Sequence, residues 1–341
     1  MTTTSPKISV VMSVYNGEPF LREAVDSILA QTFTDFEFII VDDCSTDDSL
    51  KTLRSYRDPR IKILESSVNQ GIPRQVNRGI AEARGKYIAR MDSDDISLPD
   101  RFQKQYDFLE SHPDFGLLGG EIEKIDRAGQ FIGISWNFSA PAEEVPIVLL
   151  FTNYFAQPTV MIRRDALPEG PYREKFIVSS DYDLWTRIAD NWQVWNLPET
   201  LIKYRDHGGN ISSVKQKLCR ELVRDILGQQ LAKLKIEFSP DDLEFHNSLS
   251  FDKLEINQQI LNRADKWYLK IYQANEQVKK YDRVLLFKSL FGRWSLLCRQ
   301  YQVNKFQQLY CLLSSSLLKK GHLGISGWGR LAMILIKRLF R

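Results

Sequence analysis

Cysteine is scarce in this sequence and scattered along it. The four cysteines, Cys44, Cys219, Cys298 and Cys311, form no C-x-x-C pair and show no metal-ligand spacing. This excludes a disulfide scaffold and a cysteine zinc site, and it favours a reducing, cytoplasmic setting.

Long apolar runs are also missing. No uninterrupted run approaches the roughly 20 residues that a membrane-spanning helix needs. The N-terminal stretch MTTTSPKISVVMSVY holds one lysine and a short apolar run typical of a strand, so we expect no signal peptide. With 341 residues and 43% hydrophobic content, the chain can form one large domain or two smaller ones.

Acidic residues are absent after Asp282. Residues 283–341 carry eleven lysines and arginines, a formal charge of +11, whereas the rest has 35 basic and 43 acidic residues, a charge of −8. On a helical projection of the tail 328–341, the basic side chains gather opposite an apolar face. This pattern predicts an interfacial helix on an anionic membrane surface. Packing on the catalytic domain or on a second subunit is the alternative, and the many leucines disfavour nucleic acid as the partner.

Glycine-rich phosphate loops are missing as well. The first expected strand is followed by neither G-x-G-x-x-G nor a P-loop. Any phosphate is therefore held by something other than a glycine cradle.

The first hundred residues alternate between strand and helix. Apolar runs at 7–14, 36–43, 60–64 and 86–91 predict buried strands, and helical spacing separates them. The alternation predicts an α/β fold with a parallel, doubly wound sheet, and an antiparallel α+β arrangement is the alternative. Gly85 is the expected C-cap of the helix that starts near residue 72.

The alternation weakens after residue 110. We expect further strands in 114–126 and 129–136, a short strand within 155–167, a strand that leads into a glycine-rich loop within 194–212, a helix from Ser180, and mainly helix from residue 214 onward. The predicted organisation is a domain at 1–213, divided into halves at 1–110 and 111–213, followed by a helical region at 214–341.

One stretch concentrates acidic side chains where a strand ends. ARMDSDDISLPDR, residues 89–101, contains Asp92, Asp94, Asp95 and Asp100, which repel one another unless a positive group lies among them. In open α/β sheets, ligands bind beyond the carboxyl ends of the strands. Carboxylates bind phosphate through a shared divalent cation. The cluster therefore predicts a metal that holds a diphosphate.

Six stretches in order resemble the family 2 glycosyltransferases, which have the GT-A fold. They are SVVMSVYNGEPFLREAVDSILAQTF, FIIVDDCSTDDS, NQGIPRQVNRGIAEARGKYIARMDSDD, QPTVMIRR, SDYDLWTRIA and YRDHGGNIS, and they span about residues 6–212. The resemblance implies an inverting transfer of a sugar from a nucleotide-sugar, a UDP-hexose or UDP-N-acetylhexosamine, to an acceptor hydroxyl. The implied setting is bacterial surface polysaccharide assembly, with a glycan or lipid-linked glycan as acceptor and the enzyme peripheral on the inner face of the cell membrane.

The resemblance implies that residues 1–110 are the nucleotide-binding half and residues 111–213 the acceptor half. It also implies which side chains bind the nucleotide-sugar. Tyr15 stacks near the base, Glu18 lies close to the nucleoside, and Asp43 points at the base or ribose, whereas Asp42 orients its loop. Asp92 faces the ribose or the metal. The complete implied set is Ser13, Tyr15, Glu18, Asp43, Asn77 and Asp92.

Metal and catalytic residues follow from the same resemblance. Asp94 contacts Mg²⁺ or Mn²⁺, His207 reaches the metal or the diphosphate, and Asp181 is the catalytic base. The family often has Glu-Asp where this chain has Ser180-Asp181, and relatives often have His in place of Gln157. Asp95 is alternatively a cap of the next helix. The glycine-containing loop 205–213 is the candidate lid.

Two other classes of protein remain as alternatives. A glycoside hydrolase also uses two carboxylates, although it needs no nucleotide half. A non-catalytic binding or scaffold protein of polysaccharide assembly can keep the fold without keeping Asp43, Asp94 and Asp181.

Overall fold

The computed structural model describes residues 5–135, 140–209, 214–251, 254–301 and 305–320. The chain divides into two compact units: unit 1 comprises residues 1–149 and 153–226, and unit 2 comprises 150–152 and 227–341. The division falls inside helix α8 (Gln216–Lys233), thirteen residues after the boundary at 213 that the sequence predicts.

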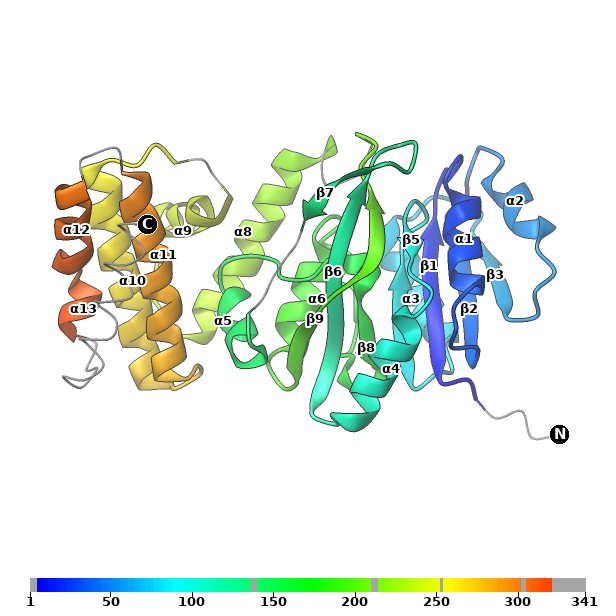
Figure 1. Ribbon diagram of the computed structural model, residues 1–341, viewed down its shortest axis with the longest axis horizontal. Coiled ribbons are helices and arrows are strands. Elements are labelled where there is room, and N and C mark those ends of the chain that lie inside the picture. The colour runs from blue at the N-terminus through cyan, green and yellow to red at the C-terminus, as the bar shows by residue number, and fades with distance from the viewer. Residues whose placement is uncertain (1–4, 136–139, 210–213, 252–253, 302–304, 321–341) are drawn as a thin grey trace. The chain divides into compact units, whose positions relative to one another are not determined.

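Unit 1 contains one mixed sheet (Figure 1) with the order β3-β2-β1-β4-β8-β6-β9-β5, and β7 pairs with β6. The four strands expected from the first hundred residues pair in parallel, which confirms the doubly wound prediction for this half. The runs of β1, β2 and β4 are buried on both faces, as is typical of parallel strands, whereas the residues of the edge strand β3 are half-buried or exposed. The four strands are β1 (Ile8–Val14), β2 (Phe36–Asp42), β3 (Ile61–Glu65) and β4 (Tyr87–Met91).

Helices cover both faces of this parallel half. Val10 and Met12 share a core cluster with residues of α1, whereas a Cβ built on Gly79 of α3 would lie 2.6 Å from Val11. Because side chains alternate along a strand, α1 and α3 lie on opposite faces. The helices here are α1 (Leu21–Leu29), α2 (Ser49–Ser55), α3 (Ile72–Glu82) and α4 (Arg101–Ser111).

The other half of the sheet mixes directions. Strand β8 runs antiparallel to both β4 and β6, and β6 runs parallel to β9. The strands are β5 (Ile96–Ser97), β6 (Phe115–Ile125), β7 (Phe131–Ser135), β8 (Met161–Arg163) and β9 (Gln193–Arg205). The short helices are η1 (Ala142–Glu144), α5 (Val145–Val148), η2 (Gln157–Thr159), η3 (Arg164–Ala166) and α6 (Ser180–Ile188).

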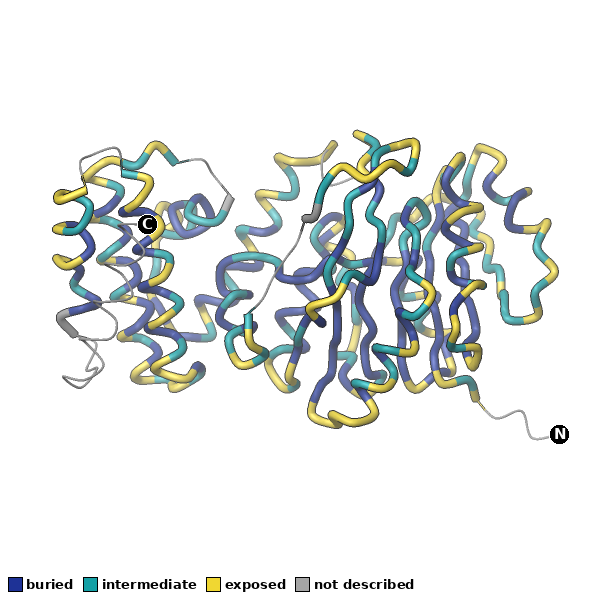
Figure 2. The backbone as a smooth tube through the Cα atoms, in the orientation of Figure 1, coloured by how far each residue is buried: buried dark blue, intermediate teal, exposed yellow. Residues whose placement is uncertain are grey.

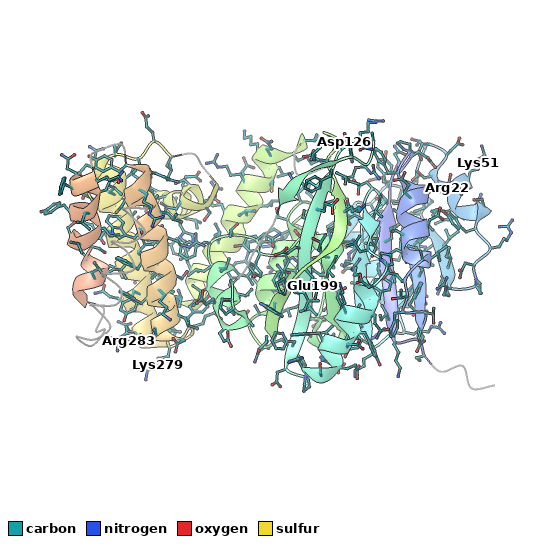
Figure 3. All side chains as sticks on the ribbon, in the orientation of Figure 1. Arg22, Lys51, Asp126, Glu199, Lys279 and Arg283 are labelled. Carbon is teal, nitrogen blue, oxygen red and sulfur yellow. The ribbon has the colours of Figure 1, made fainter. Side chains whose placement is uncertain are left out.

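Unit 2 is helical, as expected from residue 214 onward. Asp282 caps α11 by accepting from the backbone N–H groups of Val284 and Leu285, at 2.9 Å each. Lys279 and Arg283 flank the turn between α10 and α11 (Figure 3). The helices are α9 (Pro240–Phe251), α10 (Gln258–Val278), α11 (Arg283–Gln300), α12 (Lys305–Ser314) and α13 (Ser316–Lys320). Within the described residues, no helix has both the length and the apolar character needed to cross a bilayer.

Gly85 corrects one expectation. Helix α3 ends at Glu82 with Ala83 as its C-cap, so Gly85 is not the cap. Its N–H donates to Ser9 Oγ at 2.7 Å, and a Cβ at this position would lie 2.5 Å from the backbone nitrogen of Ser9. Glycine is required here because the chain passes directly against β1.

Gly85→Ala should therefore destabilise unit 1 by about 1–3 kcal/mol, the usual cost of overpacking a tight contact. The measurement is urea unfolding of the full chain with both variants in parallel. Glu82→Ala, three residues earlier, is the control: it removes an exposed ion pair with Lys62 and should shift the free energy of unfolding by no more than about 0.5 kcal/mol. Equal midpoints for the two variants would contradict this assignment.

Candidate active site

Strand directions gather several loops at one edge of the sheet. Strands β4 and β6 both run antiparallel to β8, and β6 is parallel to β9, so the carboxyl ends of β1, β2, β4, β6 and β9 face the same edge. Asp126, which follows β6, lies at this edge (Figure 3). The strand order reverses between β1 and β4, and ligands of open α/β sheets bind at such a reversal.

Backbone strain also concentrates at these loops. Asn16 follows β1, Cys44 follows β2 and Ser179 precedes α6, and all three non-glycine residues have positive φ, between 52° and 65°. Such conformations persist where surrounding contacts enforce them, often at functional sites.

The acid cluster after β4 is surrounded by buried arginines. Arg90, Arg101 and Arg205 have at most 1% of their surface exposed, and they come from β4, α4 and β9 respectively. These cations supply positive charge among Asp92, Asp94 and Asp95. Sequence reasoning missed all three, because an arginine in an apolar run gives no signal of which acid it meets after folding.

Arg205 connects the cluster to the end of β9. Its backbone N–H donates to Asp95 Oδ1 at 2.8 Å, and its Nε donates to the backbone oxygen of Asp94 at 2.9 Å. Its guanidinium also donates to Glu23 Oε2 at 2.5 Å and lies 4.6 Å from the ring centroid of Phe20. One side chain therefore fixes the loop after β4, the end of β9 and helix α1 together.

Asp95 is part of this network. It is 1% exposed, and α4 begins later, after Asp100, so the alternative that Asp95 caps the next helix is wrong. Burial raises the pKa of the Asp95 carboxyl well above its usual range, and the neighbouring Asp94 and Asp92 raise it further.

Arg90 and Arg101 hold the strand that precedes the acid cluster through hydrogen bonds to backbone oxygens. The Arg90 guanidinium donates to the backbone oxygen of Val11 and lies 3.4 Å from Asp92 Oδ1. Arg101 donates to the backbone oxygens of Arg90 at 2.8 Å and Val160 at 3.2 Å. Burial, together with the nearby Arg90, lowers the pKa of Arg101 to about 9. These bonds couple β4 to its neighbours β1 and β8.

Asp92 lies between Arg90 and Gln157. Gln157 Nε2, on η2, donates to Asp92 Oδ1 at 3.3 Å, so the position where relatives often have His contacts the predicted donor-binding acid. Burial raises the pKa of Asp92 to about 6 against the lowering effect of Arg90, and Asp94 and Asp181 contribute to the increase. Both acids therefore lie near enough to Asp92 to affect its charge.

Asp94 and His207 are brought together from positions 113 residues apart. His207 Nε2 lies 3.0 Å from Asp94 Oδ2, and the imidazole ring lies 5.2 Å from the ring of Phe20. A carboxylate oxygen and an imidazole nitrogen at this separation can both reach one divalent cation. Among the described residues, no group of three or more ligating side chains meets at one point.

Asp181 lies at the start of α6, half-buried. Its Oδ2 accepts from Asn153 Nδ2 at 3.0 Å, and burial raises the pKa of the carboxyl. Asp183, two residues later, is 1% exposed and is held by Arg173 and Arg187. The two acids of SDYD thus differ in surroundings: Asp183 is a buried anchor between two arginines, whereas the Asp181 carboxylate accepts from Asn153 and from backbone N–H groups at the start of α6.

The loops after β1 and β2 are fastened to each other. Gly17 N donates to Ser49 Oγ at 2.8 Å, and Glu18 Oε1 accepts from Thr52 Oγ1 at 2.7 Å. Tyr15 is 52% exposed, and Ser13 is half-buried in β1. Glu18 also lines an open hollow of about 830 Å³ beside α1 and α2, whose lining contains none of Asp92, Asp94 or Asp181. The hollow is therefore separate from the acid cluster.

Asp43 and Asn77 make contacts within the chain. The Asp43 carboxylate accepts from the N–H groups of Gln70 and Gly71, each at 2.8 Å, and fixes the loop before α3. Asp42 Oδ2 accepts from Ser45 N at 3.1 Å, so Asp42 orients its own loop. Asn77 makes two bonds to the backbone of Tyr172, at 2.7 and 2.9 Å.

Two predicted features fall partly or wholly outside the described residues. In the candidate lid 205–213, the structure describes only Arg205 to Gly209, where Gly208 has φ 73°. The predicted amphipathic tail 328–341 lies outside the described residues entirely.

Comparison with known proteins agrees with this geometry. The family described as Glycosyl transferase family 2 matches residues 9–169. The O-antigen biosynthesis glycosyltransferase WbnJ of Escherichia coli is 37% identical over 221 residues, covering 62% of this chain and 83% of WbnJ. The uncharacterized glycosyltransferase MJ1057 of Methanocaldococcus jannaschii is 35% identical over 205 residues, covering 59% of this chain and 71% of that protein.

Solved structures share the fold at low sequence identity. TarS of S. aureus in complex with UDP-GlcNAc aligns with a TM-score of 0.58 and 18% identity, over 90% of this chain and 89% of that one. The mannosyltransferase PcManGT of Pyrobaculum calidifontis, in complex with GDP-Man and Mn²⁺, aligns with a TM-score of 0.50 and 17% identity, over 93% and 89%. The chain has the GT-A fold and belongs to glycosyltransferase family 2.

Proposed function

We propose that this glycosyltransferase moves a sugar from a nucleotide-sugar to an acceptor hydroxyl with inversion of the anomeric centre. The observation that carries the proposal is the grouping of Asp92, Asp94, His207 and Asp181 beside the reversal of strand order. It supplies a place for a metal-bound diphosphate and, close by, a carboxylate that can accept a proton.

A divalent cation, Mg²⁺ or Mn²⁺, fits Asp94 and His207. One carboxylate and one imidazole are few ligands, but Mg²⁺ commonly binds one or two protein groups and completes its shell with substrate phosphates and water. The Mn²⁺ in PcManGT supports a metal in this fold. When bound, the cation offsets the negative charge that grows on the departing diphosphate.

Asp181 is the proposed general base. Asn153 and backbone N–H groups at the start of α6 orient the Asp181 carboxylate, which takes the proton of the attacking hydroxyl. Because burial raises its pKa, Asp181 is a stronger base than an exposed aspartate. Attack opposite the leaving diphosphate then inverts the anomeric carbon in a single displacement.

The loops after β1 and β2 are the proposed nucleoside site. Tyr15 presents an exposed ring for the base, and Ser13, Glu18 and Asp92 lie on loops or strand ends of the same edge. Asp43 and Asn77 contribute by fixing the loop before α3 and the segment at Tyr172. The UDP-GlcNAc bound in TarS supports a UDP-hexose or UDP-N-acetylhexosamine as donor.

The proposed acceptor is a glycan or lipid-linked glycan of bacterial surface polysaccharide, and WbnJ supports this setting. The enzyme then works at the inner face of the cell membrane, held by the basic tail. A non-catalytic scaffold is the second candidate, and transfer measurements with the Asp181 variant below decide between them.

Asp94→Asn should keep the fold and lose metal-dependent donor binding, because the amide is a much weaker ligand for a divalent cation. The measurement is the thermal shift with a UDP-sugar, with and without Mn²⁺. Asp100→Asn is the matched control, since Asp100 belongs to the same acid stretch but pairs with Lys104. A Mn²⁺-dependent shift in Asp94→Asn equal to that of the control would refute the metal assignment.

Asp181→Asn should bind donor and metal normally but transfer sugar about 10²–10⁴ times more slowly, because the proton acceptor is gone. In the unmodified enzyme, the acidic limb of kcat/KM should lie above the ordinary pKa of an aspartate, since only ionised Asp181 is active. The control is Asp165→Asn, at an exposed aspartate. Transfer by Asp181→Asn at more than a tenth of the control rate places the base elsewhere, and no transfer by any form favours the scaffold.

Removing residues 321–341 should weaken binding to anionic vesicles. A chain that ends at Lys320 keeps the contacts of Asp265 with Ser315 and Ser316, so α13 stays anchored. Co-sedimentation of both chains with neutral and anionic vesicles measures the effect. Equal binding of the two chains to anionic vesicles would show that residues 321–341 do not attach the protein to the membrane.

A further inference from the structure

The outer face of α12 exposes three large apolar side chains in a row. Phe306 is 81% exposed, Tyr310 74% and Leu313 52%. Their spacing of four and three residues places them on one side of the helix. Figure 2 shows this exposure along α12, the helix labelled in Figure 1.

The rest of the helix is fixed, so this face cannot turn inward. Cys311 and Leu312, on the opposite side of α12, are 7% and 1% exposed. Gln308 Nε2 donates to the backbone oxygens of Arg299 at 3.3 Å and Tyr301 at 2.9 Å, which ties α12 to the end of α11. Leu296 of α11 adds a further exposed apolar side chain, at 56%.

The surroundings of this face are cationic. Residues 283–320 carry seven lysines and arginines and no acid. Lys305 and Arg299 are exposed next to the apolar row. The nearby Asp265 carboxylate accepts hydrogen bonds of 2.7 to 3.0 Å from Ser315 Oγ and from the backbone N–H of Ser316. Exposed apolar side chains with basic neighbours, on helices α11 and α12 that carry no acid themselves, are the composition of a surface that lies in a lipid headgroup layer.

The positive charge around the apolar row favours one of the possible binding partners of this face over the others. Residues 321–341 contain four basic residues and no acid, so they offer the face no opposite charge. A second copy related by two-fold symmetry would bring the same basic patch against itself. An anionic lipid surface complements both the apolar row and the cations.

We propose that the α12 face, defined by Phe306, Tyr310 and Leu313, is a membrane-contacting surface that inserts between anionic lipid headgroups. This inference adds a contact to the proposed membrane setting, but it depends on described residues of α12 and not on the tail. Two separate attachment points, each weak, together give stable attachment where one alone is readily reversible.

The test is the triple variant Phe306→Ser, Tyr310→Ser and Leu313→Ser in the full chain. Because all three side chains are exposed, the variant should keep its unfolding temperature. Its partitioning onto phosphatidylglycerol-containing vesicles should fall at least about tenfold, since each lost side chain removes apolar surface from the headgroup layer. The matched control is Phe131→Ser with Ile132→Ser on β7, where exposed apolar side chains, 59% and 52%, lie outside the basic segment.

The same triple change in a chain ending at Lys320 distinguishes the contribution of α12 to vesicle binding from that of the tail. A further loss of binding in this shorter chain supports the α12 face, whatever the tail contributes. Equal partitioning of the triple variant and the control overturns the inference. So does a triple variant that keeps vesicle binding but loses self-association in sedimentation velocity, which identifies a second copy as the occupant. Sugar transfer to a soluble acceptor tests the catalytic proposal separately, because it needs no membrane.

Discussion

The site depends on one electrostatic arrangement: a cluster of aspartates neutralised by arginines that are themselves buried. Asp92, Asp94 and Asp95 follow one strand within four residues, and without compensation their mutual repulsion would open the loop. Arg90, Arg101 and Arg205 each donate to at least one backbone oxygen, so their charges are held in place without each being paired with a single carboxylate. The cluster is therefore held in one arrangement by bonds from β4, α4 and β9.

The same arrangement makes β9 part of the site. Arg205 closes the cluster, and His207, two residues later, meets Asp94. The position of the histidine follows from that of the arginine, because Arg205 is the last residue of β9, which pairs in parallel with β6, and His207 lies two residues beyond it. Segments near residues 92 and 207 thus act as one structural element, although β6, β8 and α6 separate them in sequence.

Sequence reasoning anticipated what depends on periodicity and on short motifs. The parallel half, with β1 to β4, follows from continuous apolar runs, and the pairing of Asp94 with His207 was expected from their motifs. The buried arginines were not anticipated, because their partners are backbone oxygens on other strands. The role of Gly85 was misassigned for a similar reason: the contact with Ser9 that excludes a side chain is tertiary, and a helix end nearby offered a local explanation. The contacts of Asp43 with the loop before α3 likewise depend on how two segments meet.

Helix α6 has a further consequence for how the enzyme can change. Asp183, clamped by Arg173 and Arg187, fixes the first turn of the helix whether or not a substrate is bound. Asp181 consequently loses its conformational entropy when the chain folds, so this cost does not recur each time a substrate binds. Folding stability and the proposed proton transfer thus belong to different aspartates on one helical turn. The neighbourhood of Asp181 is then free to diverge toward new acceptors, while the helix that carries it remains in place.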